Sequence, residues 1–264
     1  MLDVEFAELS DTGPVRDRNE DYLGCALPAT PERARTHGWL FALADGVGGH
    51  DHGEVAARLA IETLVSGFRE RAGTEPNGAL LKRLGRAANL KIFDAGMAAG
   101  GNGARMATTL VACALRHDRA TVAHAGDSRC YLIRNGRATA LTRDHTFSSE
   151  QALLGLISAF DVGPRSCVLS RSLGAEMFVK IETAERQVMP GDVLLLCSDG
   201  LHRAIGEADI VRAVEDSPAL PAAARDLVAL ANQRDGGDNV SLQLIRVRGV
   251  ERVGMYRRLR DKLR

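Results

Sequence analysis

The spacing of apolar residues switches several times along this chain between the period of a strand and that of a helix, and this order constrains the fold more than any other feature. The spacing predicts short strands at residues 4–9, 22–27 and 38–44, and then helices at 53–71 and 76–98. It next predicts an antiparallel meander of strands at 108–115, 120–125, 129–133 and 137–141. The predicted series ends with a strand at 193–197, helices at 207–214 and 221–233, and a strand at 240–247.

Strands and helices are therefore segregated along the chain rather than strictly alternating. This order favours an α+β fold in which antiparallel sheets stack together with helices outside, and it disfavours a parallel Rossmann sheet. A chain of 264 residues is long enough for one substantial core. We expect a single catalytic domain over residues 1–248, with a less regular segment at 146–167 and a basic, arginine-rich tail at 249–264.

Charge and cysteine content exclude several classes of protein. Lys+Arg and Asp+Glu number 34 each, so no overall basic field exists to attract nucleic acid or a membrane surface. The five cysteines are scattered, which indicates neither a disulfide framework nor a zinc site. Because we find no signal peptide and no apolar run long enough to span a bilayer, we expect a cytoplasmic monomer that binds neither nucleic acid nor membrane.

Acidic residues stand beside glycine at the ends of predicted strands. Asp45-Gly46, Gly126-Asp127 and Asp199-Gly200 each follow a strand, and Asp238 precedes the last one. A single Asp-Gly pair is more often only a turn, but four acids at strand ends are harder to attribute to chance. Converging carboxylates repel one another unless cations lie between them, and oxygen ligands without a Cys or His cluster select Mg²⁺ or Mn²⁺.

Six short motifs occur in an order that resembles the metal-dependent protein phosphatase family, type 2C, and most closely its bacterial branch. Each motif is short, but the ordered set is highly specific and spans residues 13–247. The motifs are Arg16-Asp17-Arg18-Asn19-Glu20-Asp21, Asp45-Gly46-Val47-Gly48-Gly49-His50, Thr108-Thr109-Leu110, Gly126-Asp127-Ser128-Arg129, Cys197-Ser198-Asp199-Gly200 and Gly237-Asp238-Asn239.

The resemblance implies a four-layer α-β-β-α sandwich, with two central antiparallel β-sheets flanked by helix pairs. It also implies the metal ligands: Asp45 would bridge two cations, with Gly46 offering its carbonyl oxygen and Glu20 serving one cation. Asp199 and Asp238 would hold the other cation. Asp127 resembles the ligand of a third, weaker metal site, and Asp21 and Asn239 would lie in the outer shell around the ligands.

The resemblance further implies hydrolysis of phosphoserine and phosphothreonine in proteins. A water between two divalent cations loses a proton far more readily than bulk water, and the cations neutralise charge at the phosphorus. Arg16 matches the arginine that grips the phosphate, so we assign Arg16, Asp45 and Asp199 to catalysis. Expected partners are phosphorylated proteins, including those of a cognate bacterial serine/threonine kinase. Residues 146–167 occupy the position of the family's flap and are predicted to tune substrate access and the affinity for the third metal.

One departure from the family pattern concerns the proton donor. Many relatives have histidine directly after the bridging Asp-Gly, whereas this chain has Val47, which cannot donate a proton. A metal-bound water, His50 or His52 remains open as the general acid.

Other functions also remain to be weighed. Cys197 and Arg203 match the Cys-x-x-x-x-x-Arg pattern of cysteine-dependent phosphatases, but Asp199 would place a negative charge inside that phosphate cradle. A pseudophosphatase that only binds is a second alternative, although every expected motif acid is present. Metal-dependent phosphodiesterase action is a distant third.

Overall fold

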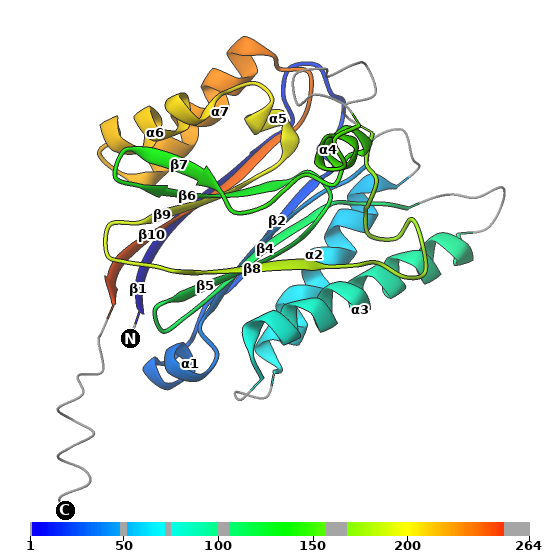
Figure 1. Cartoon of the computed structure of the whole chain (residues 1–264), viewed down its shortest axis with the longest axis horizontal. Helices are drawn as coiled ribbons and strands as arrows, with labels where there is room; N and C mark the ends of the chain where they lie inside the picture. The colour runs from blue at the N-terminus through cyan, green and yellow to red at the C-terminus, as the bar shows by residue number, and fades with distance from the viewer. Residues whose placement is uncertain (1, 48–51, 72–74, 100–105, 157–167, 251–264) are drawn as a thin grey trace, which may run out of the picture.

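The computed structural model describes residues 2–47, 52–71, 75–99, 106–156 and 168–250, and two five-stranded antiparallel sheets form its centre (Figure 1). The first sheet has the order β1 (Leu2–Asp11), β10 (Val240–Val250), β9 (Val193–Cys197), β6 (Arg129–Arg134) and β7 (Arg137–Ala140). The second has the order β2 (Asp21–Ala26), β3 (Trp39–Asp45), β4 (Leu110–Arg116), β5 (Arg119–Ala125) and β8 (Glu182–Gln187).

Helices cover the outer face of each sheet. α2 (Gly53–Arg69) and α3 (Asn77–Ala98) pack on the second sheet, and α6 (Glu207–Asp216) and α7 (Leu220–Arg234) pack on the first (Figure 1). Three short helices, α1 (Pro31–Thr36), α4 (Phe147–Leu153) and α5 (Asp199–His202), lie in the connections. The expected four-layer α-β-β-α sandwich is confirmed.

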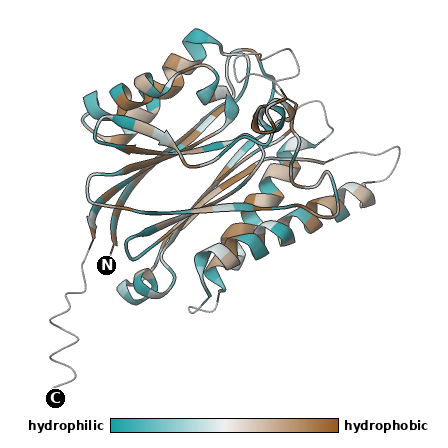
Figure 2. Ribbon diagram, viewed as in Figure 1, coloured by the Kyte–Doolittle hydropathy of each residue, from teal (hydrophilic) through white to brown (hydrophobic). Residues whose placement is uncertain are grey.

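Alternation along the strands divides the apolar core into three layers. In β9, Val193, Leu195 and Cys197 face α6 and α7, while Leu194 and Leu196 face the other sheet. Because both faces of this strand are covered, all of its residues from Val193 to Cys197 are apolar and buried. The helices alternate between hydrophobic and hydrophilic residues along their length, as helices buried on one side should (Figure 2).

The predicted four-stranded meander is wrong, because it is divided between the two sheets. β4 and β5 pair in one sheet, whereas β6 and β7 pair in the other. The chain crosses at Gly126, whose φ of +109° is accessible to glycine and strained for other residues, and a Cβ there would lie 2.7 Å from Thr109. The predicted tight turn at Asn135-Gly136 is confirmed, with positive φ at both residues.

Four elements were missing from the prediction, and several boundaries differ from it. β8 is a polar edge strand, while α1, α4 and α5 are short helices, so none of the four produces a long apolar pattern. β10 continues through Gly249 and Val250, the first residues assigned to the tail. α4 begins one residue after Thr146, inside the predicted flap. Residues 157–167 of the flap and 251–264 of the tail lie outside the described residues.

Candidate active site

The acids predicted from strand ends gather at one end of the two sheets. Asp45 ends β3 and lies opposite Asp21 at the start of β2. Asp199 follows β9 at the first turn of α5, and Asp238 lies two residues before the start of β10, the neighbour of β9. Asp127 lies in the crossing from β5 to β6. The second sheet therefore supplies Asp21 and Asp45, and the first supplies Asp199 and Asp238.

Two threonine side chains hold the backbone of Asp45. The Thr108 hydroxyl and the Thr109 N–H both donate to the Asp45 carbonyl oxygen at 2.8 Å, and the Asp45 N–H donates to Thr109 Oγ1 at 3.1 Å. Thr109 Oγ1 in turn lies 2.7 Å from Ser128 Oγ, beside Asp127. The Thr-Thr and Asp-Ser motifs are thus joined to the Asp-Gly motif by hydrogen bonds that fix where the Asp45 carboxylate emerges.

Negative charge is concentrated around Asp45. Burial first, and then Asp21, Asp199, Asp127 and Asp238, hold the pKa of the Asp45 carboxyl well above its ordinary value. Burial also raises the pKa of Asp21 to about 7 and that of Asp127 to about 6. Such shifts mark carboxylates that are costly to ionise together without a compensating cation.

The backbones of Glu20 and Gly46 lie in direct contact. The Gly46 N–H donates to the Glu20 carbonyl oxygen at 3.1 Å, and a Cβ on Gly46 would lie 2.5 Å from the Gly53 carbonyl carbon. A Cβ on Gly53 would in turn lie 3.2 Å from Glu20 Cδ. Only glycine fits at position 46, and the Glu20 carboxylate packs directly beside the start of α2.

Asn239 ties the loop that carries Glu20 to the end of the first sheet. Its Oδ1 accepts from the Glu20 N–H at 2.9 Å, and its Nδ2 donates to the carbonyl oxygens of Thr12 and Arg18. Asp21 is held similarly, because Ser198 Oγ donates to its Oδ2 at 2.9 Å. Among the described residues Asp21 Oδ1 has no hydrogen-bond partner. Asn239 and Asp21 therefore bond to the segments that carry the acids, while their place in the outer shell around bound cations stays a prediction.

Two arginines approach the acids from outside. Arg16 Nη2 donates to Asp238 Oδ2 at 2.9 Å, and its Nε donates to the Gly237 carbonyl oxygen. Arg203 donates from Nη1 to Asp199 and from Nη2 to Asp127. Arg16 was predicted and lies beside the acids; Arg203 was considered only as part of a cysteine-phosphatase pattern, and its pairing with two acids was missed.

The donor set fits two hard divalent cations. Side chains of Glu20, Asp45, Asp199 and Asp238 and the carbonyl of Gly46 offer oxygen alone, which is the chemistry that Mg²⁺ and Mn²⁺ select. Burial and neighbouring acids raise the pKa of the Asp45 carboxyl, so its ionised form needs compensating positive charge, which divalent cations would supply.

Comparison with known proteins agrees with this geometry. The family model described as Protein phosphatase 2C matches residues 19–241. The chain belongs to the protein phosphatase 2C family. The chain is 31% identical over 244 residues to the serine/threonine phosphatase stp of Listeria innocua, covering 89% of this chain and 93% of that protein. It is 35% identical over 257 residues to the serine/threonine protein phosphatase PstP of Mycobacterium tuberculosis, covering 91% of this chain but 44% of that protein.

Solved structures of phosphatases share the fold. The Mycobacterium tuberculosis PstP crystal structure superposes with a TM-score of 0.82 at 31% identity, covering 94% of this chain and 100% of that one. A PstP catalytic domain in complex with two manganese ions has a TM-score of 0.79 at 33% identity, covering 94% and 100%. Two predictions are confirmed: the chain is a bacterial member of the type 2C family, and it is an enzyme of the protein serine/threonine phosphatase class.

Among the described residues near Val47, no histidine lies where it could donate a proton to the leaving group. Val47 is held by its N–H donating to the Ala107 carbonyl oxygen, His52 is exposed with a φ of 79° at the start of α2, and His50 lies outside the described residues. Within the described part of the chain, His202 Nε2 lies 2.9 Å from the Asp127 backbone carbonyl oxygen, and no imidazole contacts the carboxylate of Asp45, Asp199 or Asp238.

The structure offers no support for a thiolate mechanism. Cys197 is buried within β9, where burial raises the pKa of its thiol to about 12. The thiol is therefore protonated at neutral pH and is not a nucleophile. Arg203, the second residue of that pattern, is already bonded to two carboxylates.

A second group of ligand-type side chains was missed by sequence reasoning. His124, His145 and Glu182 place ligand atoms within 4.8 Å of one another at the β5–β8 edge. The two imidazoles stack in parallel, 4.6 Å apart, so their lone pairs do not converge on one ion. Arg171 Nη1 lies 2.8 Å from His145 Nε2 and 3.1 Å from Glu182 Oε1, so a cationic side chain already compensates this group.

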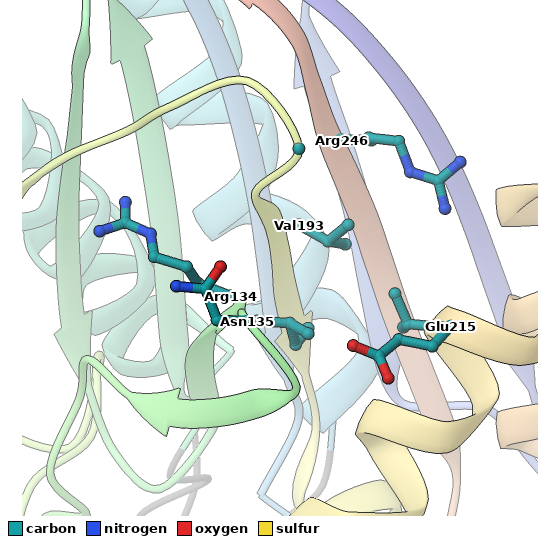
Figure 3. Close-up of a pocket in the computed structure, with 8 residues that line it drawn as sticks. Arg134, Asn135, Val193, Glu215 and Arg246 are labelled. Carbon is teal, nitrogen blue, oxygen red and sulfur yellow. The ribbon is translucent and has the colours of Figure 1, made fainter.

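A cavity of about 280 Å³ lies at the other end of the first sheet (Figure 3). Val193 lines it, whereas Cys197, at the opposite end of β9, leads into the acids. Arg134 also lines the cavity but forms a two-pronged ion pair with the buried Asp192 at 2.7 Å. The cavity is therefore separate from the phosphatase site.

None of the helices among the described residues has the length and apolar composition needed to cross a bilayer.

Proposed function

We propose that this chain hydrolyses phosphoserine and phosphothreonine in proteins, using two Mg²⁺ or Mn²⁺ ions held by the acids at the end of the two sheets. One cation would be held by Asp45, the Gly46 carbonyl oxygen and Glu20. The other would be held by Asp45, Asp199 and Asp238. The names of the relatives, which are serine/threonine phosphatases, and the two manganese ions in one PstP structure support this substrate class and this metal number.

The observation that carries the proposal is the placement of Asp45 among four other acids. Its pKa is raised well above the ordinary value by burial and by these neighbours. A buried carboxylate of this kind at the end of a strand is expected where positive charge is supplied by bound ions. When bound, the two cations supply a more acidic water and neutralise charge on the phosphoryl oxygens.

Arg16 is suited to hold the substrate's phosphate. Its side chain is 44% exposed and contacts Asp238 on the open side of the acids. A phosphate that reaches this side competes with Asp238 for the same guanidinium, and the planar guanidinium can donate two parallel bonds to it. Arg16 therefore orients the phosphoester while Asn239 and Asp21 keep the surrounding loops in place.

The biological setting follows from the same substrate class. We infer that the chain reverses the action of a bacterial serine/threonine kinase on cytoplasmic proteins, as a monomer. The flap at 146–167 would tune access of these substrates, since the segment that follows it is joined to the site: Leu173 and Thr108 exchange backbone hydrogen bonds, and Thr108 also bonds Asp45.

The proposal is tested by metal-titrated dephosphorylation of a phosphothreonine peptide by the wild type and Asp199→Asn. Because the variant loses one charged ligand, we expect a loss of at least about a hundredfold in kcat/KM, equivalent to about 2.7 kcal/mol of transition-state stabilisation. Asp216→Asn, at the exposed end of α6, is the matched control and should behave as wild type. A near-normal rate for Asp199→Asn would refute the two-metal assignment, and activity that survives EDTA but is lost with iodoacetamide would favour a thiol mechanism.

A further inference from the structure

Arg203 binds two of the site's acids with one guanidinium. Its Nη1 lies 2.7 Å from Asp199 Oδ2, and its Nη2 donates to Asp127 Oδ2 at 2.8 Å. Asp199 and Arg203 are one helical turn apart, and the Arg203 N–H donates to the Asp199 carbonyl oxygen at 2.9 Å. The fold of α5 therefore places the guanidinium between an acid of its own turn and an acid from the crossing between the sheets.

The residue before Arg203 fixes Asp127 as well. His202 Nε2 lies 2.9 Å from the Asp127 carbonyl oxygen, within hydrogen-bond distance of it. His202 at the end of α5 and Arg203 directly after it thus contact the backbone and the side chain of Asp127, whose side chain is only 5% exposed.

We propose that Arg203 takes the place of the third, weaker cation expected at Asp127, so that this phosphatase binds two metal ions rather than three. This inference rests on the proposed function, since it assumes the two ions held around Asp45. A third ion shared by Asp127 and Asp199 would compete with Arg203, because each of these carboxylates already accepts a charge-assisted bond from it at Oδ2. It would also have to enter beside a guanidinium that keeps its charge at every working pH.

Arg16, the other arginine at the site, differs from Arg203 in its partners. Among the described residues it contacts one acid, Asp238, and its Nε donates to the Gly237 carbonyl oxygen. Within the same part of the chain, Asp238 Oδ1 accepts from the neighbouring Asn239 N–H alone. Arg16 can therefore leave Asp238 for a phosphate, whereas Arg203 is fixed at both ends by carboxylates. Its charge beside Asp199 is permanent and is not removed by a chelator.

Metal stoichiometry tests the proposal directly. The full chain, stripped with EDTA, is dialysed against increasing Mn²⁺ up to the millimolar range, and bound manganese is measured by elemental analysis. We expect two ions per chain for the wild type and three for Arg203→Ser. Arg203→Gln removes the same charge while keeping a hydrogen-bonding side chain, and it should also bind three. Thermal unfolding of each variant checks that it is folded.

Two further variants locate the added ion. Arg203→Ser combined with Asp127→Asn should return to two ions, and Arg212→Ser, which removes an exposed arginine on α6, should stay at two. Three ions on the wild type, or only two on both Arg203 variants, would overturn the role of Arg203 while leaving the two-metal proposal intact. Fewer than two ions on the wild type would instead refute the two-metal assignment and this inference with it.

Discussion

At the scale of single residues, the threonine hydroxyls beside Asp45 determine how accurately the acids converge. Thr109 bonds both the Asp45 N–H and Ser128, so one hydroxyl links the end of β3 to the crossing that carries Asp127. The sequence showed this residue as part of a motif but could not show its partners, because Asp45 and Ser128 are distant in the chain. Its contribution depends on a contact that exists only after folding.

Thr109→Val keeps the shape of this buried side chain and removes its hydroxyl. We expect a loss of about 1–3 kcal/mol in the free energy of unfolding, because the Asp45 N–H loses its partner. We also expect turnover to fall by about tenfold or more, since small displacements of a reacting group are costly. Urea denaturation and phosphopeptide kinetics at saturating Mn²⁺ measure the two effects. Thr139→Val, at an exposed position on β7, is the control, and equal behaviour of the two variants would contradict the role of Thr109.

At the scale of elements, the predicted helices and strands were mostly correct where one apolar pattern runs for a whole element. α2 and α3 follow the predicted ranges closely because each buries a long face on the second sheet. β8 was missed because its residues Glu182–Gln187 are polar and it lies at a sheet edge. The meander was wrong because local spacing specifies strands and turns, while the partner sheet of β6 depends on the crossing at Gly126.

His145 joins several of these elements and carries a testable dependence on pH. Its Nδ1 accepts from the Gly126 N–H, its carbonyl oxygen accepts from the N–H of Ser170, which follows the flap, and burial and then His124 lower its pKa to about 4. The unfolded chain takes up this proton near pH 6.5. Above pH 6.5 His145 is neutral in both states, and the free energy of unfolding does not depend on its titration. As the pH drops from 6.5 toward 4, the unfolded chain alone binds the proton, and the free energy of unfolding falls by at most about 1.4 kcal/mol per pH unit.

His145→Asn should make that pH dependence shallower, because its amide oxygen can still accept from Gly126 but cannot titrate. Chemical denaturation between pH 4 and 7 measures the slope. His124 and His202, whose pKa values burial also lowers, should retain part of it. Glu182 stays ionised over this range, because the bonds from Arg171 and His145 outweigh burial and hold its pKa at about 2. An unchanged slope in His145→Asn would show that this group does not titrate as described.

At the scale of the whole molecule, the acids come from both sheets, so bound cations should hold the two sheets together. Asp21 and Asp45 belong to one sheet, and Asp199 and Asp238 adjoin the other. A ligand that binds only the folded chain stabilises it in proportion to the logarithm of its concentration, which gives about 2.7 kcal/mol at a hundred times its Kd. For a chain of this size we expect Tm to rise by about 5–10 °C with Mn²⁺.

Asp45→Asn should change both the stability of the metal-free fold and the stabilisation by Mn²⁺, in opposite directions. The raised pKa of Asp45 means that its ionised form destabilises the metal-free fold, so the variant should unfold at a higher temperature than metal-free wild type. It should also lose most of the Mn²⁺-induced rise, because the bridging ligand is gone. Differential scanning fluorimetry with EDTA or Mn²⁺ measures both, with Asp216→Asn as control. A full Mn²⁺ response in Asp45→Asn would contradict its place as the bridging ligand.

The sequence by itself determined the types and order of most elements, and it placed acids at the ends of strands, because periodicity and Asp-Gly punctuation are local properties. It also identified Asp45, Asp127, Asp199 and Asp238 as acids that should converge, and the resemblance to a known family added Glu20. Only the tertiary structure decided which sheet each strand joins and that Arg203 lies between Asp127 and Asp199. The reason is physical: contacts between residues far apart in the chain depend on how the layers pack, and residue spacing does not specify that packing.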